Sequence, residues 1–205
     1  MFVSDCQLKG GGMGTVEQKH QIILEHEKSF ADHLALKVLE KPKLSVWMIL
    51  IPIIFVHYFH RIQKFNSGRS AFTENYMIVR KRALDEAIEV IQTERAPDIE
   101  GLARLSKLPE SVHGPHLKML DLLVSHYTDL MRSDGDTMES LVRSLYKTRT
   151  NYLLFVNQLN QTERTLNSVL KPHLAVSVEG VDEIISAMET YSEKLRRNHA
   201  ETAFP

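Results

Sequence analysis

Two pairs of histidines come closest, in residue type and spacing, to a site that could bind a metal ion. His57 and His60 lie three positions apart, and so do His113 and His116. His57 and His60 would share one face of a helix, whereas His113 and His116 form a pair in an expected loop. Imidazole is a common ligand of zinc, iron and copper. One pair supplies two ligands, whereas a structural zinc site needs four. We therefore predict no cofactor, and keep metal or haem binding through these histidines as an alternative.

Ligand-type side chains are also frequent near the N-terminus, where His20, His26 and His33 stand among acidic residues. Six or seven positions separate these histidines, whereas ligands on one helix face are three or four apart. We interpret this stretch as a polar, solvent-exposed helix face.

Motifs of catalysis are absent from the sequence. It contains no Gly-x-Ser-x-Gly elbow, no His-Glu-x-x-His motif and no dinucleotide-binding fingerprint. The single cysteine, Cys6, excludes an intramolecular disulfide and a cysteine-based zinc site within one chain. The 25 basic and 26 acidic residues leave a net charge of -1, which produces no overall field for nucleic acid. We predict a protein that is not an enzyme and does not bind nucleic acid.

One apolar segment, Leu44–Phe59, dominates the sequence. From Leu44 to Val56 its only polar side chain is Ser45, and no charge follows until Arg61. A helix that is apolar on every face is difficult to bury in a small bundle, which favours a membrane. The predicted anchor residues are Val46, Trp47, Met48, Ile49, Leu50, Ile51, Pro52, Ile53, Ile54, Phe55, Val56 and Tyr58.

Aromatic and basic residues near both ends of the apolar segment support this interpretation. Trp47 and Tyr58 stand where the aromatic belts of membrane proteins lie. Basic residues close to an anionic surface contribute about 1 kcal/mol each. The residues that we expect to contact headgroups are Lys41, Lys43, Arg61, Lys64, Arg69, Arg80, Lys81 and Arg82.

The length of the apolar segment leaves its path open. As a helix it covers about 24 Å, against a hydrocarbon core of about 30 Å. It could form a single span kinked at Pro52, or dip into one leaflet and turn back at Pro52. The basic run Arg80–Arg82 favours a span with the C-terminal domain in the cytoplasm, and this is the arrangement that we expect. In a third alternative the protein is soluble and residues 44–60 form a core helix.

The rest of the chain shows helical periodicity, with apolar residues three and four apart. The sequence predicts a flexible tail over 1–16, an amphipathic helix over 17–43, the membrane segment over 44–60 and a cytoplasmic helical domain over 61–205. Within that domain we expect helices over 70–93, 98–107, 116–132, 137–170 and 181–197. Proline and glycine predict a loop over 109–115, and residues 175–178 are a candidate strand.

Two local signals set the expected helix ends. Asp136, with Glu139 three residues later, suggests an N-cap and capping box for the helix over 137–170. Pro172 is expected to end that helix.

The predicted fold class is all-α, with an N-terminal amphipathic helix, one short apolar membrane segment and a C-terminal antiparallel helical bundle. Its function would be that of a membrane-anchored interaction or scaffold protein, with membrane lipid and a protein as partners. Apolar residues in the helix over 137–170 recur at nearly seven-residue intervals, as in a coiled coil, although Arg149 and Glu163 interrupt them. This pattern favours self-association.

Overall fold

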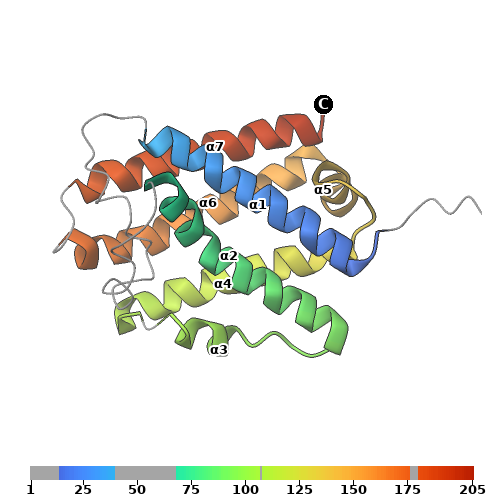
Figure 1. Ribbon diagram of the computed structural model, residues 1–205, viewed down its shortest axis with the longest axis horizontal. Coiled ribbons are helices and arrows are strands. Elements are labelled where there is room, and N and C mark those ends of the chain that lie inside the picture. Colours follow the sequence, from blue (N-terminus) through green and yellow to red (C-terminus); the bar gives the residue numbers. More distant parts are fainter. Residues whose placement is uncertain (1–13, 40–67, 107, 176–179) are drawn as a thin grey trace, which may run out of the picture.

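The computed structural model describes residues 14–39, 68–106, 108–175 and 180–205 (Figure 1). Within these residues the secondary structure consists of seven α-helices and contains no strand, which confirms the all-α prediction. The helices are α1 Val16–Leu39, α2 Gly68–Thr93, α3 Ile99–Arg104, α4 Glu110–Arg132, α5 Met138–Tyr146, α6 Arg149–Ala175 and α7 Val181–Ala203.

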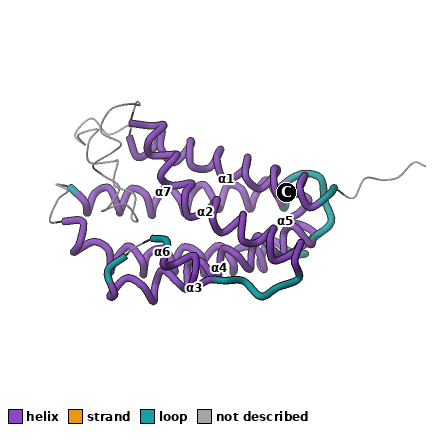
Figure 2. Tube along the Cα trace, turned by 60° about the horizontal axis from the view of Figure 1, so that its bottom comes forward, coloured by secondary structure: helices purple, strands orange, loops and turns teal. Residues whose placement is uncertain are grey.

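Five helices pack in a closed ring. α1 contacts α2 and α7, α2 contacts α4, α4 contacts α6, and α6 contacts α7. α5 lies across one end of this ring, where it touches α1, α4, α6 and α7, and α3 packs on the outside of α4 (Figures 1 and 2). The predicted helical bundle is therefore confirmed, and α1 belongs to it. The packing joins the predicted N-terminal helix to the predicted C-terminal domain.

The core is built from the apolar faces of these helices. Ile23 and Leu34 of α1 are completely buried, as are Ala83 of α2 and Leu130 of α4. Burial of such faces, more than intrinsic helix propensity, holds helices of this length in place. Among the described residues, only Leu105 and Leu154 are large apolar side chains with more than half of their surface exposed.

The structure corrects the loop that was predicted over residues 109–115. α4 begins at Glu110 and continues through Pro115. Pro115 lacks the N–H that would bond to the carbonyl of Ser111, so one helical hydrogen bond is lost. The buried face of Val112, His116 and Met119 is continuous across this position, and its packing holds the helix together.

The long helix predicted over 137–170 is two helices. Lys147 has a positive φ of 64°, which ends α5, and the Thr148 hydroxyl accepts from the Asn151 N–H as α6 begins. The N-cap of α5 is Thr137 and not Asp136. Thr137 Oγ1 accepts from the Ser140 N–H, and the Ser140 hydroxyl accepts from the Thr137 N–H.

The C-terminal boundaries differ from the prediction too. α6 passes through Pro172 and ends at Ala175, so the candidate strand begins inside a helix. The apolar face of α6, which suggested a coiled coil, packs within the ring: Tyr152, Val156 and Leu166 are buried. That face therefore provides no seam for a second copy.

The apolar segment and the predicted anchor residues lie outside the described residues. Within the described part of the chain, no helix combines the length and apolar character that a bilayer crossing requires. The predicted membrane association is thus not supported by the helices described, and it stays a prediction that concerns residues 44–60.

Candidate functional site: a buried charge network in the ring

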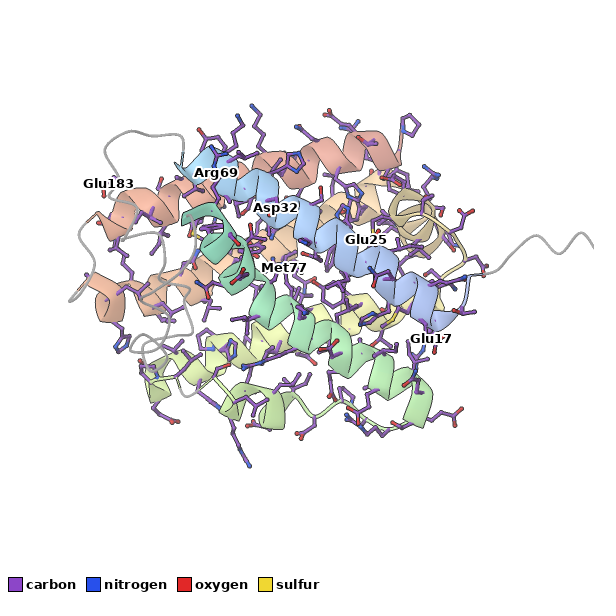
Figure 3. All side chains as sticks on the ribbon, in the orientation of Figure 1. Glu17, Glu25, Asp32, Arg69, Met77 and Glu183 are labelled. Carbon is purple, nitrogen blue, oxygen red and sulfur yellow. The ribbon has the colours of Figure 1, made fainter. Side chains whose placement is uncertain are left out.

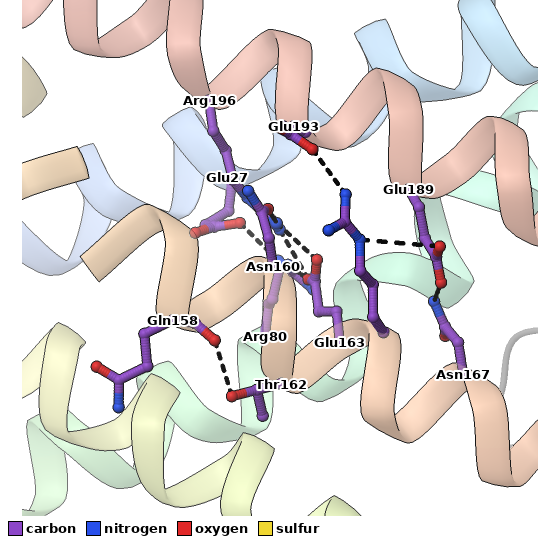
Figure 4. A network of polar contacts seen from close by, with 11 residues as sticks. Glu27, Arg80, Gln158, Asn160, Thr162, Glu163, Asn167, Glu189, Glu193 and Arg196 are labelled. Atoms are coloured by element: carbon purple, nitrogen blue, oxygen red, sulfur yellow. Dashed lines mark hydrogen bonds and ion pairs between the residues drawn. The ribbon is translucent and has the colours of Figure 1, made fainter. Parts of the chain in front are cut away.

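Arg80 of α2 lies at the centre of the ring and bridges two acidic residues from other helices (Figure 4). Its Nε donates to Glu27 Oε2 of α1 at 2.8 Å, and its Nη2 donates to Glu163 Oε1 of α6 at 2.8 Å. Only 5% of Arg80 is exposed. The prediction that Arg80 contacts lipid headgroups is therefore wrong, because its guanidinium is enclosed and paired inside the bundle.

Arg196 of α7 binds the other side of Glu163. Its Nη1 donates to Glu163 Oε2 at 2.6 Å and its Nη2 to Glu163 Oε1 at 2.7 Å, while Nη1 also donates to Asn160 Oδ1. A guanidinium is suited to this two-pronged binding of a carboxylate. Figure 4 shows Glu163 approached by both arginines. The network thus connects α1, α2, α6 and α7.

The charges in this network balance. Two guanidiniums face two carboxylates, and Glu27 Oε1 also accepts from the Tyr127 hydroxyl of α4 at 2.9 Å. An aromatic ring lies over each cation, because Cζ of Arg80 is 4.0 Å from the Tyr76 ring centroid and Cζ of Arg196 is 5.3 Å from that of Phe30. Such pairing is required before charges can be held in a low-dielectric interior.

The pKa of Glu163 reflects this pairing. Burial alone would raise it, but Arg196 and Arg80 stabilise the carboxylate more strongly and hold the pKa at about 2. The pKa of Tyr127 lies well above its usual range, mainly because the ring is buried. Glu163 is therefore ionised and Tyr127 neutral at physiological pH.

Three histidines lie beside the network. His126 Nδ1 pairs with the Tyr146 hydroxyl and His199 Nδ1 with the Tyr152 hydroxyl, each at 2.8 Å. The ring centroids of His26 and His199 are 4.4 Å apart. Burial lowers the pKa of His126 to about 3, that of His199 to about 4, and that of His26 as well. These histidines are neutral at physiological pH.

A cavity of about 30 Å³ adjoins both groups of side chains. A cavity of this size holds about one water molecule, and polar walls favour its presence. The polar side chains that line the cavity are His26, Glu27, Arg80, His126, Tyr152 and Arg196. The arrangement can therefore fix helices and order a water molecule. Among the described residues it presents no group of three or more histidine, cysteine or acidic side chains that could hold a metal ion.

Of the predicted histidine candidates, the two that the structure describes, His113 and His116, do not form part of this centre. His116 is buried on α4, with its Nε2 3.1 Å from the Ser106 hydroxyl, and burial lowers its pKa to about 4. His113 Nε2 lies 3.8 Å from Glu100 Oε2. His57 and His60 lie outside the described residues.

The residues that were predicted to contact headgroups do not share one environment in the structure. Arg69, at the start of α2, and Lys81 are exposed, whereas Arg82 is half-buried and its Nη1 has no hydrogen-bond partner among the described residues. Lys41, Lys43, Arg61 and Lys64 lie outside the described residues.

Sequence reasoning missed the network itself. In the sequence, Glu163 appeared only as an interruption of an apolar stripe. The usable signal was a charged residue on the apolar face of a helix, at Arg80 and again at Glu163. No protein-family model, curated protein or solved structure matches the chain.

Proposed function

We propose that this protein is a membrane-anchored helical interaction protein, with Leu44–Phe59 as its anchor and the ring of helices as the domain that binds a partner. The observation that carries this proposal is that the ring closes without the apolar segment. α1, α2, α4, α6 and α7 bury one another's apolar faces. Arg80, Glu163 and neighbouring side chains occupy the centre. This packing leaves no central place for a further apolar helix, which supports an anchor over a core helix.

The described part of the chain exposes two large apolar side chains at which the interaction part of the proposal can be tested. Leu105, next to α3, is 60% exposed and borders an open groove of about 620 Å³ that also includes Leu102, Glu89 and Arg95. Leu154 of α6 is 62% exposed. Single exposed apolar side chains are normal on protein surfaces, so Leu105 and Leu154 serve here as the positions at which a partner contact is tested.

Membrane attachment can be tested by fractionation of cells that express the full chain, followed by an alkaline carbonate wash. We expect the chain in the washed pellet. An Ile51→Glu variant should be released, because a charge within the hydrocarbon costs about 3 kcal/mol. The matched control is Leu105→Glu, which adds the same charge at an exposed position of the described domain and should stay in the pellet.

The only tryptophan, Trp47, gives an independent measurement. With the purified full chain in phosphatidylcholine vesicles, brominated lipid should quench its fluorescence. A chain that is soluble without detergent, with unquenched Trp47 fluorescence, would overturn the proposal and favour the core-helix alternative.

The oligomeric state tests whether the partner is a second copy of this chain, which is the simplest candidate. Sedimentation of the full chain in mild detergent would measure it, and a fragment that begins at residue 61 is unsuitable because it lacks α1. An oligomer that Leu154→Glu dissociates would assign this surface to self-association. A monomer would favour a different protein at the groove beside Leu105.

A further inference from the structure

The two helices that flank the apolar segment form an antiparallel pair. Polar contacts join them at four positions along their length. From one contact to the next, the residue numbers rise on α1 and fall on α2. The contacts are Glu17 with Gln92, His20 with Asp85, Glu27 with Arg80 and Asp32 with Thr73, at 3.2, 3.3, 2.8 and 2.7 Å. The pair therefore contacts along most of its length.

The end of α1 and the start of α2 consequently lie at the same end of the ring. Beyond the contact between Asp32 and Thr73, α1 extends about 10 Å to Leu39 and α2 about 8 Å back to Gly68. Figure 3 shows Arg69 beside the C-terminal end of α1, while Glu17 lies at the opposite end of that helix. The chain thus leaves and re-enters the ring at one end.

A single span is difficult to reconcile with this pairing. A span over Leu44–Phe59 would put its two ends on opposite sides of a hydrocarbon core of about 30 Å. To restore the pairing of α1 and α2, residues 60–67 would have to cross back, and the nine steps from Phe59 to Gly68 reach about 32 Å only when the chain is fully extended. They would also carry Arg61 and Lys64 through the hydrocarbon with an unpaired backbone.

We propose that the bilayer lies against the end of the ring where α1 ends and α2 begins, so that both helices lie on the same side of it. The inference rests on the proposed function and replaces the single span that the sequence favoured with the dip at Pro52. Arg69 at the start of α2 then faces the bilayer, where anionic headgroups would attract it. Lys81 lies about 20 Å along α2 from Gly68, away from that surface.

The charge network strengthens this constraint. Arg80 holds Glu27 of α1 and Glu163 of α6 at once, and Arg196 of α7 binds the same Glu163. Separating α1 from α2 across a membrane would take Glu27 away and leave two buried guanidiniums, Arg80 and Arg196, facing the single carboxylate of Glu163. The network therefore fixes the flanking helices on one side of the bilayer.

Single cysteines on the two flanking helices test the inference in the full chain. In a Cys6→Ser background, Glu25→Cys marks α1 and Lys81→Cys marks α2, since both native side chains are exposed. Lys194→Cys on α7 is the control for the side on which the ring lies. Spheroplasts of an expressing bacterium are treated with a membrane-impermeant maleimide, before and after permeabilisation, and the membranes are then washed with alkaline carbonate.

We expect all three cysteines to share one labelling pattern in chains that remain in the washed membranes. If Glu25→Cys and Lys81→Cys label from opposite sides of the membrane, the inference is overturned while the anchor stands. Release of the chain by the carbonate wash overturns the proposed function, and the inference with it.

Discussion

Arg80 donates to Glu27 across 2.8 Å, although the two residues lie on opposite sides of the apolar segment in the sequence. The contact is buried inside the ring, and the same Arg80 side chain also donates to Glu163 of α6. The contact fixes how far α1 and α2 are shifted along each other's axes. It also fixes the position of both helices relative to the rest of the ring. A contact in the core thus determines where the chain on either side of the apolar segment can lie.

Removing Arg80 should be strongly destabilising. In Arg80→Met the Glu27 carboxylate loses its cation and keeps the Tyr127 hydroxyl, and Glu163 keeps only Arg196. Breaking a buried ion pair from one side costs about 3–5 kcal/mol, because a charge is left enclosed. We expect a loss of this size in the free energy of unfolding, measured by urea denaturation of the full chain in mild detergent.

The matched control for this measurement is Lys81→Met, one residue further on, where the side chain is exposed. Its effect should stay within about 0.5 kcal/mol. Equal stabilities of Arg80→Met and the native chain would show that the network adds nothing to the fold.

Acid should destabilise the protein in two stages. The folded-state pKa values of His126 and His199, about 3 and about 4, lie below the value of 6.5 for a free histidine. As the pH falls below 6.5 the unfolded chain binds protons that the folded chain does not, so stability decreases down to about pH 4. The folded-state pKa of Glu163 is about 2, below the value of 4.5 for a free glutamate. Stability therefore continues to decrease as the pH falls below 4.5.

The histidine part of this loss can be separated with His126→Gln. One proton difference contributes a slope of about 1.4 kcal/mol per pH unit. We expect the variant to lose stability less steeply between pH 6.5 and 4 in urea denaturation at a series of pH values. A slope unchanged by this substitution would mean that His126 is not the buried neutral group described above.

The helices and the bundle could be predicted from sequence because they depend on local periodicity. The apolar spacing placed α2 close to its observed bounds and α7 at its observed start, although α7 continues to Ala203, beyond the predicted end at residue 197. Errors occurred where a local signal competed with packing: Pro115 and Pro172 suggested helix breaks, but the buried faces of α4 and α6 continue through them.

The network could not be predicted because its partners are distant in sequence. Arg80 is 53 residues from Glu27 and 83 residues from Glu163. Within its own helix, Arg80 looks like the first member of an exposed basic run with Lys81 and Arg82. Only the packing of α2 against α1 and α4 shows that the first of these three points inward.

The N-cap of α5 can be tested by mutation, because the sequence suggested Asp136 and the structure shows Thr137. Thr137→Ala removes the hydroxyl that accepts from the Ser140 N–H, and should cost about 1 kcal/mol. Asp136→Ala removes the residue that the sequence suggested as the cap and should cost less than about 0.5 kcal/mol. Urea denaturation of the two variants distinguishes the assignments, because a larger loss for Asp136→Ala would restore the sequence-based cap.

Lys147, between α5 and α6, offers a substitution that should stabilise the protein. Its φ of 64° and ψ of −34° are unfavourable for a residue with a Cβ atom, and glycine adopts such values at little steric cost. We expect Lys147→Gly to raise the free energy of unfolding by about 1 kcal/mol, an estimate at the lower end of the usual strain. Lys147→Ala is the control, since it removes the same charge but keeps the strain, and should give no gain. Equal gains in both variants would attribute the effect to the lysine charge, whereas a gain confined to glycine assigns it to the backbone turn that ends α5 and begins α6.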